Sequence, residues 1–470
     1  MTTGTQAGMS VRENVMLPMR DGAAMATDVY LPPGAGPFPI LLERTPYGKH
    51  LPSRSEIRAA DPKAPLSRAE VARYFVERGY GVAYQDTRGR WASEGSFAKY
   101  LAEAADGFDT VEALAAMPEC DGRVGMFGLS YSAHTQVAAA SLGPPALKAL
   151  VADSGGFSNA HRSGVRQGGA FELKQATWAL RQARLSPEAA ADPVLKAALE
   201  AEDVRDWFTR MPWRPGVSPV RWHPAYERYL LDQWRAGPFD ASWRQPGLYA
   251  AGYYDRFRDV AQTHMSSWYD PYTLTAQDNY LGLKAAGAKR LGLVLGPWTH
   301  GDRSLTYSGD VDFGPAATLD GELAEDFLAF RADFFDSVFK GAGVADPEPV
   351  KVFVMGGGSG RRTASGRLDH GGHWRRFADW PPPAATPTPY YLGADGALET
   401  RPPQPGRIDY AFDPRSPVPT IGGAISSLEP VAPGGAFDQV EGPGVYGAAP
   451  PYLPLASRPD VLAFEGTESV

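Results

Sequence analysis

Short apolar runs alternate with longer helical stretches in the first third of the chain. Runs at 39–42, 81–84 and 147–152 consist mostly of apolar residues, which is typical of buried strands. The stretches 67–78 and 102–117, which lie between these runs, have helical composition. Such alternation predicts an α/β core whose first part covers residues 11–156.

The pattern changes after residue 156. Residues 157–244 contain no convincing strand but three helical stretches, at 171–184, 192–208 and 223–234. We therefore expect a helical cap inserted between strands of the sheet. A strand-like run at 247–254 and a final helix at 320–339 place the second part of the core at 245–341.

Beyond residue 341 the chain becomes rich in proline and glycine, with short alternating strands such as 389–392. This composition is typical of a β sandwich, and we assign it residues 342–470. The fold class is therefore α/β, with an inserted helical cap and a C-terminal β domain.

Ser130 lies where a strand is expected to end and a helix to begin. The run 122–128 is short, apolar and rich in glycine, and 131–140 has helical composition. A serine on such a sharp turn presents its hydroxyl at the top of the sheet, provided that its neighbours are small. The usual pattern is G-x-S-x-G, whose last glycine is replaced here by Ser132, followed by Ala133. Ser130 is therefore a candidate nucleophile, and an ordinary glycine-rich strand end is the alternative.

A serine nucleophile needs a base, and the base needs an orienting carboxylate. Four histidines lie far enough beyond Ser130 to close a late strand. Of these, His300 ends a strand-like run, whereas His264 is expected within a helix and His370 and His373 within a polar loop. Asp255 closes the run at 247–254, so we predict it as the acid. Weaker rivals, which lack such a strand before them, are Asp270, Asp302 and Asp310.

Several motifs together resemble the cocaine esterase and X-prolyl dipeptidyl peptidase family of α/β hydrolases (CocE/NonD-like hydrolases), which includes α-amino-acid ester hydrolases and glutaryl acylases. The resemblance covers nearly the whole chain. Its motifs are MRDG at 19–22, RTPY at 44–47, QDTRGR at 85–90, GLSYSA at 128–133, GYYD at 252–255, GPWTHG at 296–301 and PVKVFVMG at 349–356.

The resemblance implies a catalytic triad of Ser130, His300 and Asp255. It also implies an oxyanion hole made by the hydroxyl of Tyr47 and the backbone N–H of Tyr131. A phenol is a strong donor, and Pro46 fixes the backbone before Tyr47. The alternative to this oxyanion role is that Tyr47 is an ordinary aromatic residue of the hydrophobic core.

Family members that prefer α-amino acyl groups place carboxylates after the triad acid. Here Arg256 and Arg258 follow Asp255, which disfavours a bound ammonium, unless both point to solvent. Aromatic side chains are expected to form a pocket for bulky or aromatic acyl groups, although core packing would explain several of them equally well. The substrate-binding candidates are Trp91, Trp178, Tyr254, Arg256, Phe257, Arg258 and Trp298.

The family's C-terminal domain is a jelly roll that continues beyond the length seen here, so only part of it is expected to form. A short natural variant, a truncated reading frame and a partner that supplies the missing strands remain open. An incomplete sandwich would leave the edges of its sheets uncovered. Such edges can pair with a second copy of the chain, which would give a homo-oligomer.

The net charge of −8 argues against nucleic acid or an anionic membrane as a partner. The N-terminus has no apolar segment typical of a secretory signal, and Cys120 is the only cysteine, so we expect a cytoplasmic protein. His370 and His373 lack the further ligands of a metal cluster, and we expect no cofactor.

We therefore predict a serine hydrolase that cleaves small-molecule carboxylic esters through an acyl-enzyme. An amidase or X-prolyl dipeptidyl aminopeptidase with the same triad is the enzymatic alternative. A catalytically inactive scaffold on this fold is the alternative from another class.

Overall fold

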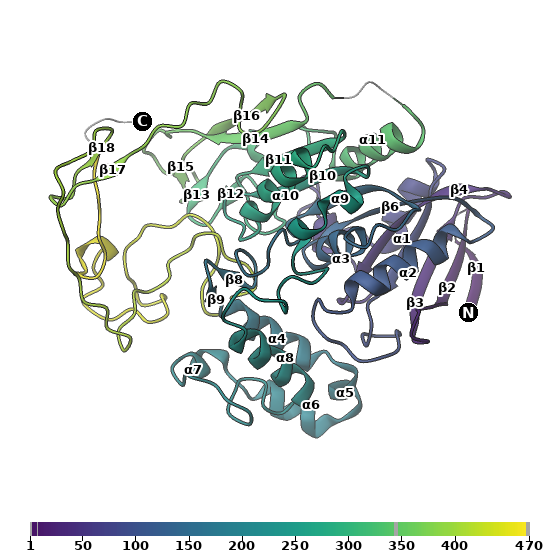
Figure 1. The fold of residues 1–470 in the computed structure, drawn as a ribbon, viewed down its shortest axis with the longest axis horizontal. Helices are drawn as coiled ribbons and strands as arrows, with labels where there is room; N and C mark the ends of the chain where they lie inside the picture. Colours follow the sequence, from purple (N-terminus) through teal and green to yellow (C-terminus); the bar gives the residue numbers. More distant parts are fainter. Residues whose placement is uncertain (1, 7, 343–345, 467–470) are drawn as a thin grey trace.

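A mixed sheet of eleven strands runs through the molecule in the computed structural model, which describes residues 2–6, 8–342 and 346–466 (Figure 1). In the spatial order given in the next sentence, each strand from β5 to β14 runs parallel to the one that follows it within that range. The pairs on either side of this range are antiparallel. In spatial order the strands are β1 (Thr2–Gln6), β2 (Met9–Pro18), β3 (Ala24–Leu31), β5 (Gly81–Asp86), β4 (Phe38–Thr45), β6 (Cys120–Leu129), β7 (Leu147–Asp153), β10 (Ala261–Ser267), β11 (Leu291–Gly296), β14 (Val350–Met355) and β16 (Gly372–Phe377). The predicted α/β core is therefore confirmed.

Helices cover both faces of this sheet. On one face, α2 (Glu103–Ala115) and α3 (Tyr131–Ala140) pack with α10 (Thr273–Ala285) against side chains such as Met126 and Leu150. On the other face, α1 (Arg68–Val76) and α11 (Phe327–Phe339) pack against the alternate residues of the same strands, Phe127 and Val151 among them. Successive strand residues point to opposite faces, so each strand contributes to both layers of the core.

The segment between β7 and β10 is mostly helical and packs around its own aromatic cluster, below the sheet in the view of Figure 1. Tryptophan, tyrosine and phenylalanine dominate this cluster and bury large areas per residue. The elements are β8 (Arg166–Gln167), β9 (Ala170–Phe171), α4 (Lys174–Arg184), α5 (Pro187–Ala191), α6 (Pro193–Glu200), α7 (Val204–Phe208) and α8 (Pro224–Arg235).

The prediction of a strand at 247–254 is wrong. This run forms the short helices η2 (Ala250–Gly252) and α9 (Tyr254–Phe257). The strand before β11 is instead β10, which contains His264, a residue expected within a helix. All seven residues of β10 are buried although most are polar, and its Gln262 and His264 side chains bond to one another at 3.2 Å. Because five of its seven residues are polar, an apolar pattern does not mark this strand.

The last part of the chain adds two strands to the main sheet. β14 and β16 extend it, while β15 (Leu368–Asp369) joins a small sheet with β12 (Tyr307–Ser308) and β13 (Val311–Asp312). β17 (Tyr391–Leu392) and β18 (Leu398–Glu399) form a hairpin, and most of the described chain from 400 to 466 follows irregular paths, with one short helix, η4 (Leu455–Ser457). The predicted partial jelly roll is thus not confirmed by the described residues; 343–345 and 467–470 of its assigned range lie outside them.

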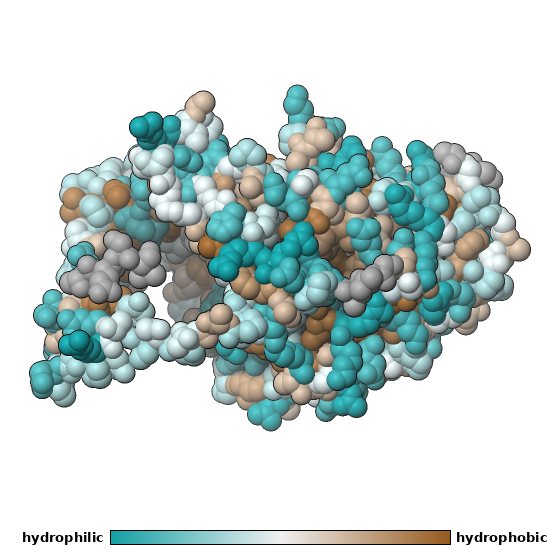
Figure 2. All heavy atoms as spheres, turned by 90° about the horizontal axis from the view of Figure 1, so that it is seen from above, coloured by the Kyte–Doolittle hydropathy of each residue, from teal (hydrophilic) through white to brown (hydrophobic). Residues whose placement is uncertain are grey.

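Within the described ranges, no helix has the length and apolarity that a membrane crossing requires. Seen from above, hydrophilic residues predominate on the surface and hydrophobic ones are scattered among them (Figure 2).

A buried ion pair joins one short helix, η1, to the core. Glu56, in η1 (Arg54–Glu56), accepts two hydrogen bonds from Arg331 of α11, of 2.9 and 2.6 Å, and both side chains are almost fully buried. Burial alone would raise the pKa of Glu56, but the nearby Arg331 lowers it overall. The pair therefore stabilises the fold above the ordinary pKa of a glutamate, and that contribution is lost as the pH falls through the lowered value.

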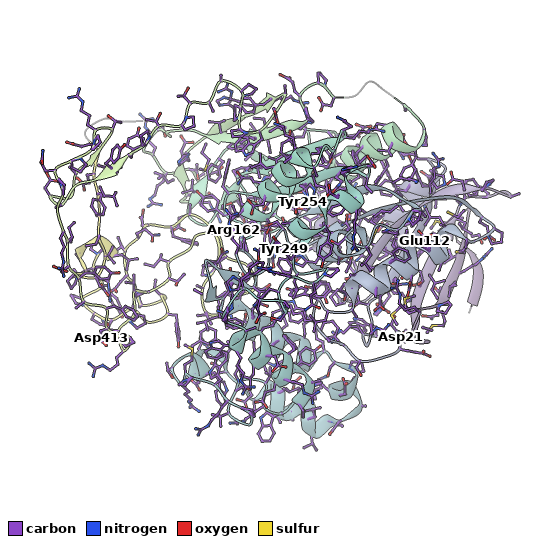
Figure 3. All side chains as sticks on the ribbon, in the orientation of Figure 1. Asp21, Glu112, Arg162, Tyr249, Tyr254 and Asp413 are labelled. Atoms are coloured by element: carbon purple, nitrogen blue, oxygen red, sulfur yellow. The ribbon has the colours of Figure 1, made fainter. Side chains whose placement is uncertain are left out.

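Glu56→Gln is expected to lower the free energy of unfolding by about 3–5 kcal/mol at pH 7, because it leaves the Arg331 charge buried without its counter-charge. Urea unfolding followed by circular dichroism measures this. The matched control is Asp413→Asn, since Asp413 forms an exposed pair with Arg415 near the edge of the molecule (Figure 3) and its loss should change little. Equal stability of the two variants would contradict the prediction.

Candidate active site

Ser130 occupies a sharp turn between β6 and α3. Its backbone has φ of 61° and ψ of −115°, a conformation that non-glycine residues rarely adopt. The turn needs small neighbours, because a Cβ atom at Gly128 would lie 2.5 Å from the Ser132 Cβ, and one at Gly155 would lie 2.4 Å from the Ser130 carbonyl oxygen. The strand–turn–helix context that the sequence predicted for Ser130 is therefore present.

Ser132, which replaces the usual glycine, has a buried partner. Its hydroxyl donates to Glu43 Oε1 at 3.0 Å, and the same carboxylate is held by Arg68. The Ser132 hydroxyl is therefore buried without being left unsatisfied, because it has a hydrogen-bond partner.

His300 lies in the loop after β11, and its Nδ1 is 3.0 Å from Oδ2 of Asp270. Asp270 follows β10, the parallel neighbour of β11, so the two loops meet at the same edge of the sheet. Asp270 is buried, which would raise its pKa, but the adjacent His300 lowers it overall. A buried carboxylate therefore stays ionised beside the imidazole.

The assignment of Asp255 as the partner of His300 is wrong. The Asp255 side chain is 84% exposed and pairs with Arg258 at 3.3 Å. The error has a local cause, since two aromatic residues precede an aspartate in both places, Tyr253-Tyr254-Asp255 and Trp268-Tyr269-Asp270. Only the second follows a strand, and recognising β10 in the sequence would have selected it.

Two cavities lie beside Ser130. An outer cavity of about 290 Å³ is lined by Ser130 and His300, and a smaller inner pocket of about 20 Å³ is also lined by Ser130. Residues common to both linings are Tyr47, Ser130, Ser426 and Ser427. The outer cavity thus has the candidate nucleophile and base in one lining, and the inner pocket shares four lining residues with it.

Tyr47, which the sequence analysis predicts as an oxyanion donor, lies on both linings. Its hydroxyl accepts a hydrogen bond from Nε1 of Trp178 at 3.1 Å, which leaves its own proton available. Burial raises the pKa of Tyr47, so the phenol keeps that proton at neutral pH.

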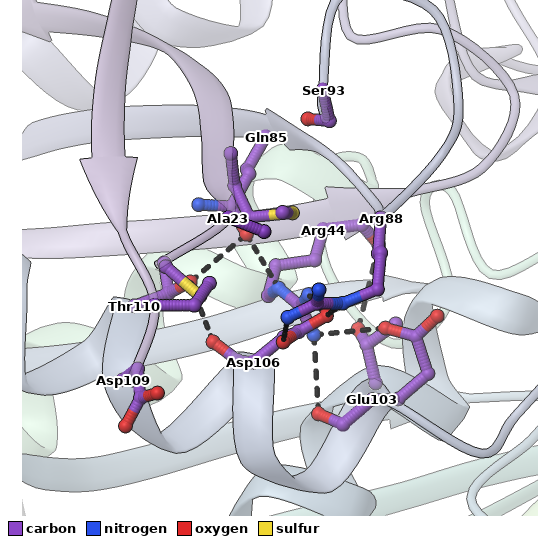
Figure 4. A network of polar contacts seen from close by, with 12 residues as sticks. Ala23, Arg44, Gln85, Arg88, Ser93, Glu103, Asp106, Asp109 and Thr110 are labelled. Atoms are coloured by element: carbon purple, nitrogen blue, oxygen red, sulfur yellow. Dashed lines mark hydrogen bonds and ion pairs between the residues drawn. The ribbon is translucent and has the colours of Figure 1, made fainter. Parts of the chain in front are cut away.

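Tyr131 follows Ser130 directly, and a polar network fixes its side chain. Its hydroxyl donates to Glu103 at 2.9 Å and accepts from the backbone N–H of Tyr100 at 2.9 Å. Glu103 in turn accepts from Arg44, which also donates to Gln85 (Figure 4). With the hydroxyl so engaged, only the backbone N–H of Tyr131 remains for the predicted oxyanion role.

Of the predicted substrate-binding residues, Trp178 lines the inner pocket. Trp91 does not line this pocket. Its indole N–H donates to the carbonyl oxygen of Pro46, and the residue lines a separate cavity together with Asp28 and Lys49. Trp298 is buried in the core, where its indole donates to the carbonyl of Ala317 at 2.7 Å. These two assignments are therefore wrong.

The four residues around Asp255 also lie away from the pocket. Tyr254 and Phe257 belong to the core, the former with its hydroxyl on Asn279 of α10 (Figure 3). Arg256 and Arg258 are exposed, and Arg256 reaches Ser141 at the far end of α3, about 15 Å along the helix from Ser130. The charge argument built on these arginines fails, because neither lines the site.

Sequence reasoning missed the polar residues of the inner pocket, Lys99, His134, Lys174, Gln175 and Tyr272. His134 lies one helical turn after Ser130, a spacing that the sequence does contain. The others come from segments whose approach to Ser130 depends on the tertiary fold.

Domain comparisons cover almost the whole chain. Residues 21–302 match the X-Pro dipeptidyl-peptidase (S15 family) domain, and 342–468 match the X-Pro dipeptidyl-peptidase C-terminal non-catalytic domain. The chain is 32% identical over 445 residues to the cocaine esterase of Rhodococcus sp. (strain MB1 Bresler), covering 88% of this chain and 70% of that enzyme.

Solved structures agree with this assignment. An α-amino acid ester hydrolase superposes with a TM-score of 0.64 at 25% identity, covering 92% of this chain and 70% of its own. An aminopeptidase from a marine sediment archaeon, Thaumarchaeota archaeon, also has a TM-score of 0.64, at 23% identity, covering 89% of this chain and 67% of its own. The family resemblance drawn from the motifs is thereby confirmed.

Proposed function

Since this chain belongs to the S15 family of X-Pro dipeptidyl-peptidases and is a serine hydrolase, we propose that it cleaves carboxylic esters through an acyl-enzyme on Ser130. The observation that carries this proposal is the 3.0 Å bond between Asp270 and His300, beside a cavity that Ser130 also lines. The proposed triad is therefore Ser130, His300 and Asp270.

Each side chain has a role that follows from its contacts. Asp270 accepts the Nδ1 proton of His300, which leaves Nε2 as the base that takes the proton of Ser130 as its oxygen attacks the ester carbonyl. Protonated His300 then gives this proton to the departing alcohol. A water activated by the same nitrogen releases the acid and restores Ser130.

The developing oxyanion would be bound by the Tyr47 hydroxyl and the backbone N–H of Tyr131. Trp178 holds the Tyr47 oxygen, and the Glu103 network holds the Tyr131 ring, so both donors are fixed before the substrate arrives. Preorganised donors of this kind stabilise the transition state more than the bound substrate.

The helical segment 157–244 would act as a cap over this site. Its helix α4 contributes Lys174, Gln175 and Trp178 to the inner pocket. The preference for bulky or aromatic acyl groups stays a prediction, with Trp178 as the predicted binding residue that lines the pocket.

A substrate panel tests the proposed function. Hydrolysis of p-nitrophenyl acetate and butyrate, with little release from Gly-Pro-p-nitroanilide, would support an esterase. A higher kcat/KM on the anilide would favour the peptidase alternative suggested by the domain match. A purified, folded protein without activity on any of the three would contradict the proposal.

Tyr47→Phe is expected to lower kcat by roughly 10²- to 10³-fold with little change in KM, because it removes a donor that acts mainly in the transition state. Steady-state kinetics on p-nitrophenyl butyrate measure this. Trp178→Phe is the control, since it removes the bond to the Tyr47 oxygen but keeps the phenol proton, and its effect should be smaller. Near-normal kcat in Tyr47→Phe would make Tyr47 a structural residue.

A further inference from the structure

The lining of the inner pocket beside Ser130 contains two buried lysines. Lys99 and Lys174 are only 3% and 6% exposed, and both line the pocket. Among the described residues of this lining there is no aspartate or glutamate. Burying two lysines at the wall of one small pocket is costly unless something compensates their charge.

Of these two lysines, only Lys174 has an ion-pair partner among the described residues. Its amine lies 2.7 Å from a carboxylate oxygen of Glu172, which is outside the lining. Lys99 donates to the neutral amide of Gln175 at 2.8 Å and lies over the Trp178 ring at 3.6 Å. Burial, together with the nearby Lys174, lowers the pKa of Lys99 well below its usual range. The charged form of Lys99 therefore needs an anion beside it.

His134 and Tyr47 add two donors to the same lining. The Nδ1 atom of His134 accepts from the backbone N–H of Gly156 at 2.8 Å, so in the neutral ring the proton is on Nε2. Burial lowers the pKa of His134 well below its usual range, which keeps the ring neutral. Its Nε2 atom is buried and has no hydrogen-bond partner among the described residues. The Tyr47 hydroxyl accepts from Trp178 and keeps its own proton for an acceptor.

The size of the pocket and its donors together define the ligand. A space of about 20 Å³ accommodates little more than one water molecule. Water would fit, but it has no charge to balance Lys99. A chloride ion is only slightly larger than water, carries one negative charge and accepts hydrogen bonds without donating any. Carboxylates, phosphates and sulfates have three or more heavy atoms and are too large.

We propose that the inner pocket binds one chloride ion between Lys99, Lys174 and His134 Nε2–H, and that this ion inhibits ester hydrolysis. The inhibition follows from the position of the pocket, because Ser130 and Tyr47 line both the pocket and the outer cavity. A negative charge there opposes the developing oxyanion, and a chloride that accepts the Tyr47 proton withdraws this donor from the oxyanion. The chloride site does not depend on the proposed esterase function, whereas the inhibition rests on it.

Thermal unfolding of the wild type in sodium chloride and in sodium gluconate of equal ionic strength tests the binding, because gluconate is too large for the pocket. At roughly ten times the dissociation constant of chloride, we expect a Tm about 1–2 °C above that in gluconate. Lys99→Met, which removes the charge without a partner, should abolish the difference. Arg258→Ala, which removes an exposed cation outside the site, should keep it. Equal Tm values of the wild type in the two salts, or an undiminished difference in Lys99→Met, would overturn the chloride site.

A crystal of the wild type grown in sodium bromide locates the ion even if Lys99→Met does not fold. Bromide has the same charge as chloride and a similar size, and it scatters anomalously. We expect an anomalous peak in contact with the amines of Lys99 and Lys174. Peaks confined to the surface of the molecule would overturn the site.

Steady-state hydrolysis of p-nitrophenyl acetate tests the inhibition. Saturating chloride should lower kcat/KM of the wild type by roughly tenfold relative to gluconate, and Lys99→Met should lose this dependence on chloride. Chloride binding with an unchanged kcat/KM would overturn the inhibition and keep the site. Chloride binding by a folded protein that hydrolyses none of the three substrates of the panel would overturn the proposed function, and with it the inhibition, but not the site.

Discussion

Ser130→Ala is expected to lower kcat for ester hydrolysis by roughly 10⁶-fold, because it removes the atom to which the acyl group is transferred. The fold should persist, since the change deletes one oxygen from a half-buried side chain and keeps the Cβ atom that the turn accommodates. Activity on p-nitrophenyl butyrate and thermal unfolding by circular dichroism measure the two effects separately.

The neighbouring hydroxyl provides the control for this change. Ser132 lies two residues away but donates to Glu43 inside the core, so Ser132→Ala should retain turnover within about tenfold of wild type despite some loss of stability. If purified Ser130→Ala kept even a tenth of the wild-type kcat, Ser130 would not be the nucleophile.

Asp270→Asn is expected to lower kcat by about 10⁴-fold, because an amide at this position no longer holds His300 in the tautomer that leaves Nε2 free to accept a proton. Asp255→Asn is the matched control. It changes an exposed carboxylate paired with Arg258 and should leave kcat and KM close to wild type.

The two aspartate variants decide directly between the alternatives that the sequence left open. A large loss in Asp255→Asn together with normal activity in Asp270→Asn would reverse the assignment made from the structure. Equal losses in both would point to an effect on folding, which circular dichroism of the two proteins would reveal.

The sequence by itself identified the elements whose signal is local. Ser130 was predicted because a glycine-rich apolar run, a sharp turn and a helix follow one another within a few residues. His300 was predicted because it closes an apolar strand, and Tyr47 because its motif and the preceding Pro46 stand at a strand end. The structure places all three on one cavity.

The acid required the tertiary structure. β10 lies inside the sheet, between β7 and β11, yet most of its buried residues are polar, so its sequence lacks the apolar pattern of a buried strand. The run before Asp255 has that pattern, yet it forms short helices. Local composition therefore favoured Asp255. The parallel pairing of β10 with β11 instead brings Asp270, which follows β10, to His300, which follows β11.

The tertiary structure also decided what surrounds the nucleophile. Lys99 precedes α2 and Lys174 begins α4, far apart in the chain, and no spacing in the sequence brings them to one pocket. The charge argument relied on Arg256 and Arg258 only because they follow Asp255, which the sequence analysis assigned as the triad acid. What the sequence alone determined is thus the chemistry of single turns and strand ends, where neighbours along the chain define the environment. The partner of His300, the donors around Ser130 and the joining of β14 and β16 to the main sheet depend on contacts between distant segments, which only the folded chain defines.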